Sequence, residues 1–329
     1  MRSAFAPGRV NLIGDHTDYT GGYVLPMAID LGITVSVDPG GDRVVLKSSI
    51  EADVVDLPIR LSDPRSVNDG WGRYVAGVIA EIRPVTGATG TVSSTLPSGV
   101  GLASSAALEV AVALALGYAG PPADLAVACQ RAEQRSAGVP CGVMDQLASA
   151  TGVAGHALLI DCSSNEVKPI AFPDGCEIVA IPSGEQRKLA RSAYAERRYA
   201  CEQAEYYLGP LRSAALVDVA KLNDPILRSR VRHVVTENSR VLEFAQLFRY
   251  GKLVEAGRLM YESHRSLRDD FNVSTPALDS IVERLMATPG VYGARLTGAG
   301  FGGCVVALTR PGVLSEGWRL EPSDGARIL

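Results

Sequence analysis

The sequence predicts an α+β protein of two domains, and three observations lead to that class. The chain has 329 residues, of which 47% are hydrophobic, so it can bury one large core or two ordinary ones. Strand-like and helix-like patterns are both present along its length. The composition changes at Ser163–Asp174, which is looser and more polar, so we expect an N-terminal domain over 1–170 and a C-terminal domain over 171–329.

The first hundred residues are predicted to form mainly strands. A first strand, Ser3–Val10, is interrupted by Pro7-Gly8. The apolar residues of Trp71–Ile82 recur at helical spacing, which predicts a helix. The other predicted strands are a hairpin of Gly22–Ile29 with Ile33–Val37, then Val44–Ser48, a weaker region at Asp53–Asp63, and Gly90–Leu96.

The rest of the chain mixes longer helices with short strands. The predicted helices are Ala106–Ala119, Ala123–Ala137, Asp145–Ala150, Ala190–Leu208, Ile226–Phe248, Leu253–Leu267 and Pro276–Thr288. The predicted strands are Ala157–Asp161, Ile178–Pro182, Val291–Leu296 and Cys304–Leu308.

Composition excludes several classes of function. The net charge is −4 and no Lys/Arg run is present, so we expect no nucleic-acid partner. No signal peptide is visible, and no apolar run approaches the roughly 20 residues that a membrane span needs. Six cysteines without CxxC pairs indicate reduced thiols, and four scattered histidines without HExxH argue against zinc. We therefore expect a cytoplasmic protein without a membrane partner.

A glycine-rich turn that leads into a helix is the strongest local signal. In LPSGVGLASSAALEVA, residues 96–111, Gly99 and Gly101 precede the serine pair Ser104-Ser105 where the helix begins. The unpaired amides of such a helix start favour an anion, most often a phosphate. A serine hydroxyl here could bind phosphate or complete the shell of a magnesium ion. The alternative is a capped helix packed in a core.

A dense polar segment follows the first strand. Asp15, His16 and Asp18 offer two acceptors and a ring that donates or accepts, a mixture that suits a ligand with several hydroxyls, such as a sugar. Arg9 adds a fixed cation to the same segment. An ordinary polar turn beside a strand arginine is the alternative.

Three further features each allow two interpretations. Asp145 stands at the start of a predicted helix, where an Asp usually caps, but an ionised carboxylate could also accept or orient a hydroxyl proton. Trp71 and Tyr74 could stack on an adenine or belong to the core. The loop of residues 298–303 matches GxGxxG, but a strand follows it, so we reject a dinucleotide site. The loop could still lie against a ligand or against the glycine-rich turn that precedes Ser104.

At this point the chain resembles the GHMP family of small-molecule kinases and its galactokinase branch. The resemblance is carried by Gly8–Tyr19, Pro97–Ala111 and Leu296–Cys304, with Gly138–Gln146 and Ser263–Leu278 between them. It implies a ribosomal protein S5 domain 2-like N-terminal domain and a ferredoxin-like C-terminal domain, with the active site between them. ATP and Mg²⁺ are the implied cofactors.

The resemblance also implies roles for individual residues. The loop of Gly99, Val100, Gly101, Leu102, Ala103, Ser104 and Ser105 would cradle the ATP phosphates, and Ser105 and Glu133 would hold magnesium. Asp145 and Arg9 would be catalytic, with Asp145 beside the sugar C1 hydroxyl. The other sugar hydroxyls would be bound by Asp15, His16, Thr17, Asp18 and Tyr194.

The expected reaction is therefore ATP-dependent phosphorylation of a sugar at C1, with D-galactose as the first choice. Two departures bear on the sugar: Asp15 replaces the usual Glu, and the stretch at 181–185 lacks the usual Asp-Thr. N-acetylgalactosamine, galactosamine or another hexose or pentose are the alternatives. A non-catalytic sugar sensor is a further alternative, but such sensors are shortened after the serine pair, which is intact here. We expect a monomer or weak homodimer.

Overall fold

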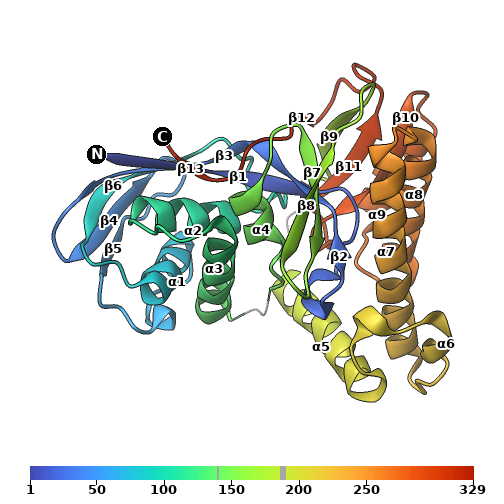
Figure 1. Ribbon diagram of the computed structural model, residues 1–329, viewed down its shortest axis with the longest axis horizontal. Helices are drawn as coiled ribbons and strands as arrows, with labels where there is room; N and C mark the ends of the chain where they lie inside the picture. The colour runs from blue at the N-terminus through green and yellow to red at the C-terminus, as the bar shows by residue number, and fades with distance from the viewer. Residues whose placement is uncertain (139–140, 186–189) are drawn as a thin grey trace.

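The computed structural model describes residues 1–138, 141–185 and 190–329. Its first sheet has the strand order β13-β1-β3-β6-β4-β5 (Figure 1), with antiparallel neighbours except for the parallel pair β4 and β6. The strands are β1 (Arg2–Asn11), β3 (Pro26–Pro39), β4 (Arg43–Ser48), β5 (Val55–Pro58), β6 (Ala88–Ser94) and β13 (Arg327–Ile328).

Helices cover one face of this sheet. They are α1 (Trp71–Ile82), α2 (Ser104–Ala115), α3 (Pro122–Ala137) and α4 (Met144–Thr151). The α2 helix packs on β1 and β3 on one side and on α1 and α3 on the other. Because it is enclosed from both sides, nearly all of its residues from Ala106 to Ala115 are buried, which explains why its sequence is almost entirely small and apolar.

The second half of the chain builds a sheet of strand order β10-β11-β9-β12 with long helices packed beside it (Figure 1). The strands are β9 (Glu177–Pro182), β10 (Val291–Thr297), β11 (Cys304–Thr309) and β12 (Trp318–Leu320). The helices are α5 (Ala190–Leu208), α6 (Leu216–Val219), α7 (Pro225–Arg249), α8 (Leu253–Asp269) and α9 (Pro276–Met286). A smaller sheet contains β2 (Tyr23–Val24), β7 (His156–Asp161) and β8 (Glu166–Ala171).

The predicted helices agree with the structure to within a few residues, apart from the end of α2. Trp71–Ile82 and Ala190–Leu208 have the predicted bounds, whereas α2 ends at Ala115, four residues before the predicted end at Ala119. Gly117 adopts φ +96° directly after it, a conformation that glycine reaches without strain and that ends the helix early. Val139 and Pro140, which belong to the segment Gly138–Gln146 that carries the family resemblance, lie outside the described residues.

The predicted hairpin between Gly22–Ile29 and Ile33–Val37 is wrong. The segment forms one continuous strand, β3, which pairs with β1 along its length, while β2 pairs with β7. Gly32 is therefore a strand residue: a Cβ there would lie 2.5 Å from Cζ of the Phe5 ring on the neighbouring strand. The glycine leaves room for that ring instead of forming a turn.

The end of the chain returns to the first sheet. The short strand β13 pairs with β1, and the Arg327 guanidinium lies 4.7 Å from the centre of the Phe5 ring. The N- and C-termini are close together for this reason (Figure 1). The division at residue 170 stays a prediction, and these last residues belong with the first sheet even though they follow the C-terminal elements.

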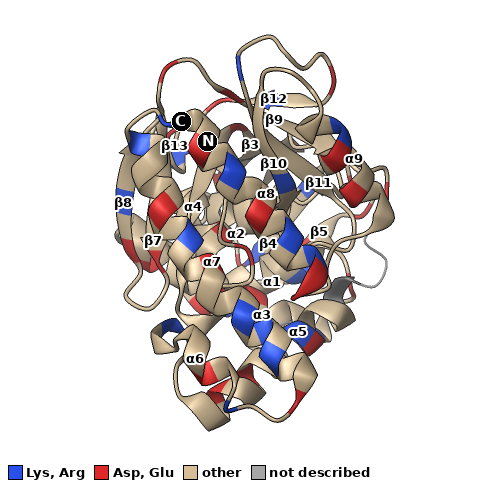
Figure 2. Cartoon of the chain, turned by 90° about the vertical axis from the view of Figure 1, so that its right-hand side faces the viewer, with Lys and Arg blue, Asp and Glu red and all other residues tan. Residues whose placement is uncertain are grey.

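Charge is evenly mixed on the face drawn in Figure 2, where basic and acidic residues alternate over α7, α8 and α9. This mixture agrees with a net charge of −4 and with the absence of a Lys/Arg run in the sequence. Within the described residues, every helix is too short or too polar to cross a membrane.

Candidate active site

A cleft of about 900 Å³ lies between the phosphate-loop candidate and the polar segment after β1. It brings together nearly all of the residues that the sequence suggested, although they come from distant parts of the chain. Those lining it are Arg9, Asp15, His16, Asp18, Gly99, Val100, Gly101, Leu102, Ala103, Ser104, Ser105, Glu133, Asp145 and Tyr194.

The glycine-rich turn has the geometry of an anion-binding loop. Gly99 and Gly101 have φ values of +73° and +87°, and Ala103 has +59° directly before α2 begins at Ser104. Ala103 has no side-chain oxygen to cap the helix, so the first amides of α2 remain available to a ligand. The helix dipole adds positive potential at the same place.

Arg9 ties this loop to the catalytic candidate. Its Nε and Nη2 donate to the two carboxylate oxygens of Asp145 at 2.7 and 2.8 Å, and its Nη1 donates to the Gly101 carbonyl at 2.8 Å. The Arg9 amide also donates to the Leu102 carbonyl at 3.1 Å. A single buried guanidinium therefore sets the distance between the phosphate loop and the Asp145 carboxylate.

Asp145 does not cap α4. The residue before that helix is Val143, and both carboxylate oxygens of Asp145 accept hydrogen bonds from Arg9. Its side chain is 29% exposed, toward the cleft, whereas Arg9 is almost fully covered behind it at 6%. The structure thus excludes the cap interpretation of Asp145, and a role of its carboxylate toward a ligand stays a prediction.

A second group of carboxylates lies beside the loop. The buried amide of Gln146 donates to Glu133 Oε2 at 2.7 Å and to Glu109 Oε2 at 3.1 Å. Burial, and then the charge of Glu133, raise the pKa of Glu109 well above its usual value. Burial, and then the charge of Asp145, also raise the pKa of Glu133, while hydrogen bonds from Cys141, Gln146 and Ser105 act in the opposite direction. Acidic groups are thus concentrated next to Ser105.

His16 is neutral and its tautomer is fixed. Burial, and then the nearby His233, lower the pKa of His16 to about 3. Its Nε2 donates to the Ala299 carbonyl at 3.2 Å, so its Nδ1 accepts from the Tyr19 hydroxyl at 3.0 Å. The ring of Tyr194, on α5, lies 5.6 Å from the His16 ring and also lines the cleft. These rings form one wall of the candidate sugar site.

Asp18 lies at the floor of the same site. Burial, and then the charge of Asp145, raise the pKa of Asp18 from 3.8 to about 7. Its carboxylate is packed directly against the Gly142 backbone, where a Cβ would lie 1.8 Å from Oδ2. Only glycine at position 142 leaves this carboxylate in the cleft.

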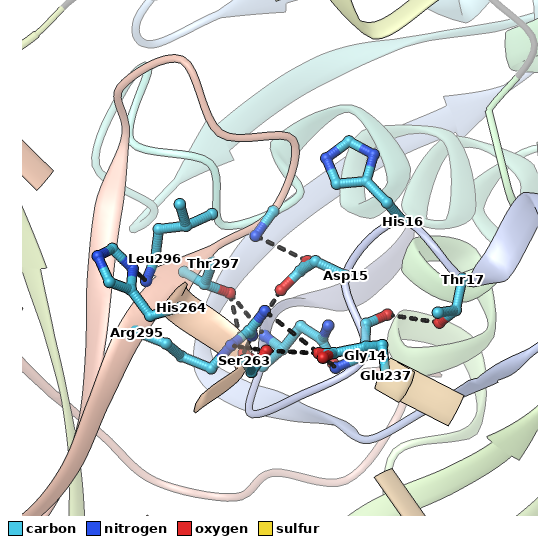
Figure 3. A network of polar contacts seen from close by, with 12 residues as sticks. Gly14, Asp15, His16, Thr17, Glu237, Ser263, His264, Arg295, Leu296 and Thr297 are labelled. Carbon is cyan, nitrogen blue, oxygen red and sulfur yellow. Dashed lines mark hydrogen bonds and ion pairs between the residues drawn. The ribbon is translucent and has the colours of Figure 1, made fainter. Parts of the chain in front are cut away.

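Thr17 lies behind the cleft. It is fully buried, and its hydroxyl is within donating distance of the Gly14 carbonyl at 2.8 Å and the Tyr23 carbonyl at 2.7 Å. Figure 3 shows its side chain turned back toward Gly14. The structure therefore gives Thr17 a role in holding the turn together, in place of the expected contact with substrate.

Asp15 reaches the cleft but is held by the protein. Its Oδ1 accepts from the Gly298 amide at 2.9 Å, and its Oδ2 pairs with Arg295 Nη1 at 2.5 Å (Figure 3). The late glycine loop thus lies against the polar segment after β1, and its predicted contact with a ligand stays a prediction. The two aromatic residues Trp71 and Tyr74 lie in different surroundings. Tyr74 lines the cleft, whereas Trp71 Nε1 donates to the Asp53 carbonyl.

Gly142, Gln146 and Gly298 lie in segments that the sequence singled out, but their contacts were not expected from it. The residues whose roles in the site were not expected are Glu109, Gln146, Gly142, Arg295 and Gly298. Two of them carry a local signal, because Glu109 is the one acid in the apolar helix α2 and Arg295 is the one charge in the strand Val291–Thr297. A charge in a buried element needs a partner, so each marks a buried polar contact.

Comparison with known families agrees with this geometry. The galactokinase galactose-binding signature matches residues 2–39, the GHMP kinases N terminal domain matches residues 73–153, and the GHMP kinases C terminal region matches residues 244–319. The fold and the phosphate-loop site thus define a GHMP-type small-molecule kinase. A crystal structure of a mevalonate kinase supports this fold, with a TM-score of 0.67, 21% identity, and coverage of 94% of this chain and 92% of that chain.

Relatives of higher sequence identity show which kind of GHMP kinase the chain resembles. The galactokinase of Chloroflexus aggregans (strain MD-66 / DSM 9485) is 43% identical over 336 residues, which covers 96% of this chain and 85% of that protein. The galactokinase of Roseiflexus sp. (strain RS-1) is 43% identical over 324 residues, with coverage of 92% and 82%. The crystal structure of Lactococcus lactis galactokinase with galactose superposes with a TM-score of 0.91 at 29% identity, covering 100% of this chain and 95% of that one. The chain belongs to the galactokinase family.

Proposed function

We propose that the protein transfers the γ-phosphoryl group of ATP to the C1 hydroxyl of a hexose, and that the hexose is D-galactose. The observation that carries the proposal is the Arg9 guanidinium, which joins the Asp145 carboxylate to the phosphate loop through Gly101. A carboxylate next to an anion-binding helix start is what transfer of a phosphoryl group to an alcohol requires. The galactokinase relatives supply the choice of galactose.

Each group has one task in the reaction. Asp145 accepts the proton of the C1 hydroxyl while the oxygen of that hydroxyl forms a bond to the γ-phosphorus. The bond between the γ-phosphorus and the β–γ bridging oxygen breaks, and ADP leaves with that oxygen. Arg9 keeps the carboxylate aligned, and the amides at the start of α2 stabilise the charge on the phosphates. Most of the catalysis is positioning.

The residues present fit a magnesium ion. Within the described chain no group of three His, Cys, Asp or Glu side chains is placed to hold a metal, but Mg²⁺ prefers one or two protein oxygens together with phosphate oxygens and water. Ser105 and Glu133 supply such oxygens. Burial, and then the charge of Asp145, raise the pKa of Glu133, and a cation would offset both by favouring the ionised carboxylate. When bound, the ion neutralises charge on the ATP phosphates.

The experiment is a substrate panel. Purified protein with Mg-ATP is tested for ADP release with galactose, glucose, galactosamine, N-acetylgalactosamine and arabinose, and the product is analysed by ³¹P NMR. We expect the highest kcat/KM with galactose and a phosphate on C1. The matched control is 1-deoxygalactose, which keeps the other hydroxyls and should give no product. Turnover of 1-deoxygalactose, or of none of these sugars, would contradict the proposal.

A first prediction concerns Gln146, whose Nε2 donates to Glu133 Oε2 at 2.7 Å and so orients this carboxylate. Gln146→Leu keeps most of the buried volume but removes this donor. We expect the Mg²⁺ concentration for half-maximal activity to rise by about tenfold, the usual scale when a group that orients a metal ligand is lost. Calorimetry should show unchanged binding of ATP without Mg²⁺. The control is Gln130→Leu, because Gln134 continues to bind the same Cys141 carbonyl.

A second prediction concerns pH. Because the pKa of Asp18 is raised to about 7, the folded protein keeps a proton between about pH 4 and 7 that the unfolded chain has lost. Asp18 therefore makes stability fall as pH rises through this window and contributes no further slope above it. Asp18→Asn cannot ionise, so we expect it to gain stability relative to the parent between pH 4.5 and 7.5, by on the order of 2 kcal/mol.

Urea unfolding of both proteins without ligand, at several pH values, measures this difference. His16 and His233 have lowered pKa values and give the opposite slope below pH 6.5, so the two proteins are compared at each pH and not over the whole curve. A difference that is constant with pH would show that Asp18 is already ionised at pH 4.5.

A further inference from the structure

Two candidate sugar-binding residues of the turn after β1, Asp15 and His16, are held in place by the C-terminal half of the chain. The Asp15 carboxylate accepts from the Gly298 amide at 2.9 Å, and its backbone carbonyl accepts from His233 Nε2 at 3.1 Å. His16 donates to the Ala299 carbonyl at 3.2 Å. The geometry of the candidate sugar site is thus set by residues that lie far along the chain, in α7 and after β10.

Arg295 is at the centre of these contacts (Figure 3). Its side chain is 0% exposed, and its Nη1 lies 2.5 Å from Asp15 Oδ2. Its Nε donates to Ser263 Oγ at 3.1 Å, and its Nη2 lies 3.8 Å from Glu237 Oε1. A fully buried guanidinium is costly unless anions and hydrogen bonds surround it, so its position is determined by these partners.

Glu237, on α7, contacts both the turn after β1 and the residues around Arg295. Its Oε1 accepts from the Gly14 amide at 3.0 Å and from Ser263 Oγ at 2.5 Å, and its Oε2 pairs with Arg240 Nε at 2.7 Å. Burial acts to raise the pKa of this carboxyl, but the charges of Arg240, His233 and Arg295 outweigh it and lower the pKa to about 2. Glu237 is therefore an anion at every working pH, and it holds Arg295 and the turn together.

We infer that Arg295 is a positioning residue that sets where the Asp15 carboxylate stands in the cleft, and thereby the preference for the part of the sugar that meets Asp15, with Glu237 as its buried counter-anion. The inference rests on the proposed function only in taking a sugar as the ligand of the cleft. Both oxygens of Asp15 are engaged by this arrangement. A side chain one methylene longer would carry the carboxylate away from Arg295 or from Gly298.

The test separates sugar binding from nucleotide binding. Arg295→Lys keeps the charge but loses the planar fork that reaches Asp15, Ser263 and Glu237 together. We expect galactose affinity, measured by calorimetry without ATP, to fall by about tenfold, while ATP affinity changes by less than twofold. Asp15→Glu should change the ratio of kcat/KM values between galactose and the 2-amino sugars and leave the KM for ATP unchanged.

A double substitution guards against simple loss of folding. Arg295→Met strands the buried Asp15 charge, whereas Arg295→Met with Asp15→Asn removes both charges and leaves Glu237 paired with Arg240. We expect the double variant to melt at a higher temperature than Arg295→Met and still to bind galactose more weakly than the parent. Thr309→Val is the control, since it removes a hydrogen bond of another buried side chain of this sheet, from the Thr309 hydroxyl to the Gly290 carbonyl, at the end away from the cleft.

Equal losses for galactose and ATP in Arg295→Lys, or unchanged galactose affinity, would overturn the inference. Additive effects of Arg295→Met and Asp15→Asn on melting temperature and galactose affinity would also overturn the inference. These results differ from a failure of the proposed function, in which the parent protein itself would phosphorylate no sugar.

Discussion

Replacing Asp145 with Asn is expected to abolish most phosphoryl transfer while ATP still binds. The amide has the shape of the carboxylate, but its oxygen accepts only one of the two Arg9 donors and its NH2 faces the other. Arg9 keeps its separate bond to the Gly101 carbonyl, so the contact with the phosphate loop remains. The amide cannot accept the proton of the sugar hydroxyl. A positioned general base contributes about 10²- to 10⁴-fold, and we expect kcat to fall by that amount.

The measurement combines ADP release with calorimetric titration of ATP. Asp145→Ala, which also removes both Arg9 contacts, should lose as much activity and bind ATP somewhat more weakly, because Arg9 also holds the Gly101 carbonyl. The difference between the Asn and Ala variants therefore separates proton transfer from positioning. A rate close to the parent for either variant would show that another group handles the proton.

The phosphate loop could be predicted from sequence because its signal is local. The glycines, the serine pair and the small apolar residues of α2 are consecutive, and local conformation alone makes a helix start with available amides. The contact of Arg9 with Asp145 joins residues 136 positions apart. Only resemblance to known kinases brought those two residues together, since no spacing in the chain relates them.

The buried polar contacts could not be predicted from one sequence. Gln146 bridges Glu109 and Glu133 because α2, α3 and α4 meet there, and that meeting is a property of packing. Thr17 stands among residues that face the cleft, yet the turn rotates it toward Gly14. Gly32 lies between the two strands of the wrongly predicted hairpin. A glycine is needed there because the Ala6 carbonyl and the Phe5 ring of the neighbouring strand occupy the space of a Cβ. Tertiary contacts determine the roles of these residues, and one sequence does not show those contacts.

Sugar binding should be lost in Gly142→Ala, a change of one methyl group. The added Cβ would lie 1.8 Å from Oδ2 and 2.1 Å from Cγ of Asp18, distances at which the carboxylate has to move out of its place in the cleft. The backbone of Gly142 is not in the left-handed region, so alanine itself is tolerated there. We expect galactose affinity to fall by about a hundredfold, the scale of losing a charged hydrogen bond, with ATP affinity nearly unchanged.

The double variant with Asp18→Ala decides whether this loss acts through Asp18. In the Asp18→Ala background the two nearest atoms are gone and the Cβ at 2.8 Å has to shift by less, so Gly142→Ala should cost much less galactose affinity than it does in the parent. The two changes should thus be strongly non-additive in a thermodynamic cycle measured by calorimetry. Additive losses would mean that the methyl group disturbs the segment before Asp145 instead, and kcat with ATP would then fall together with sugar affinity.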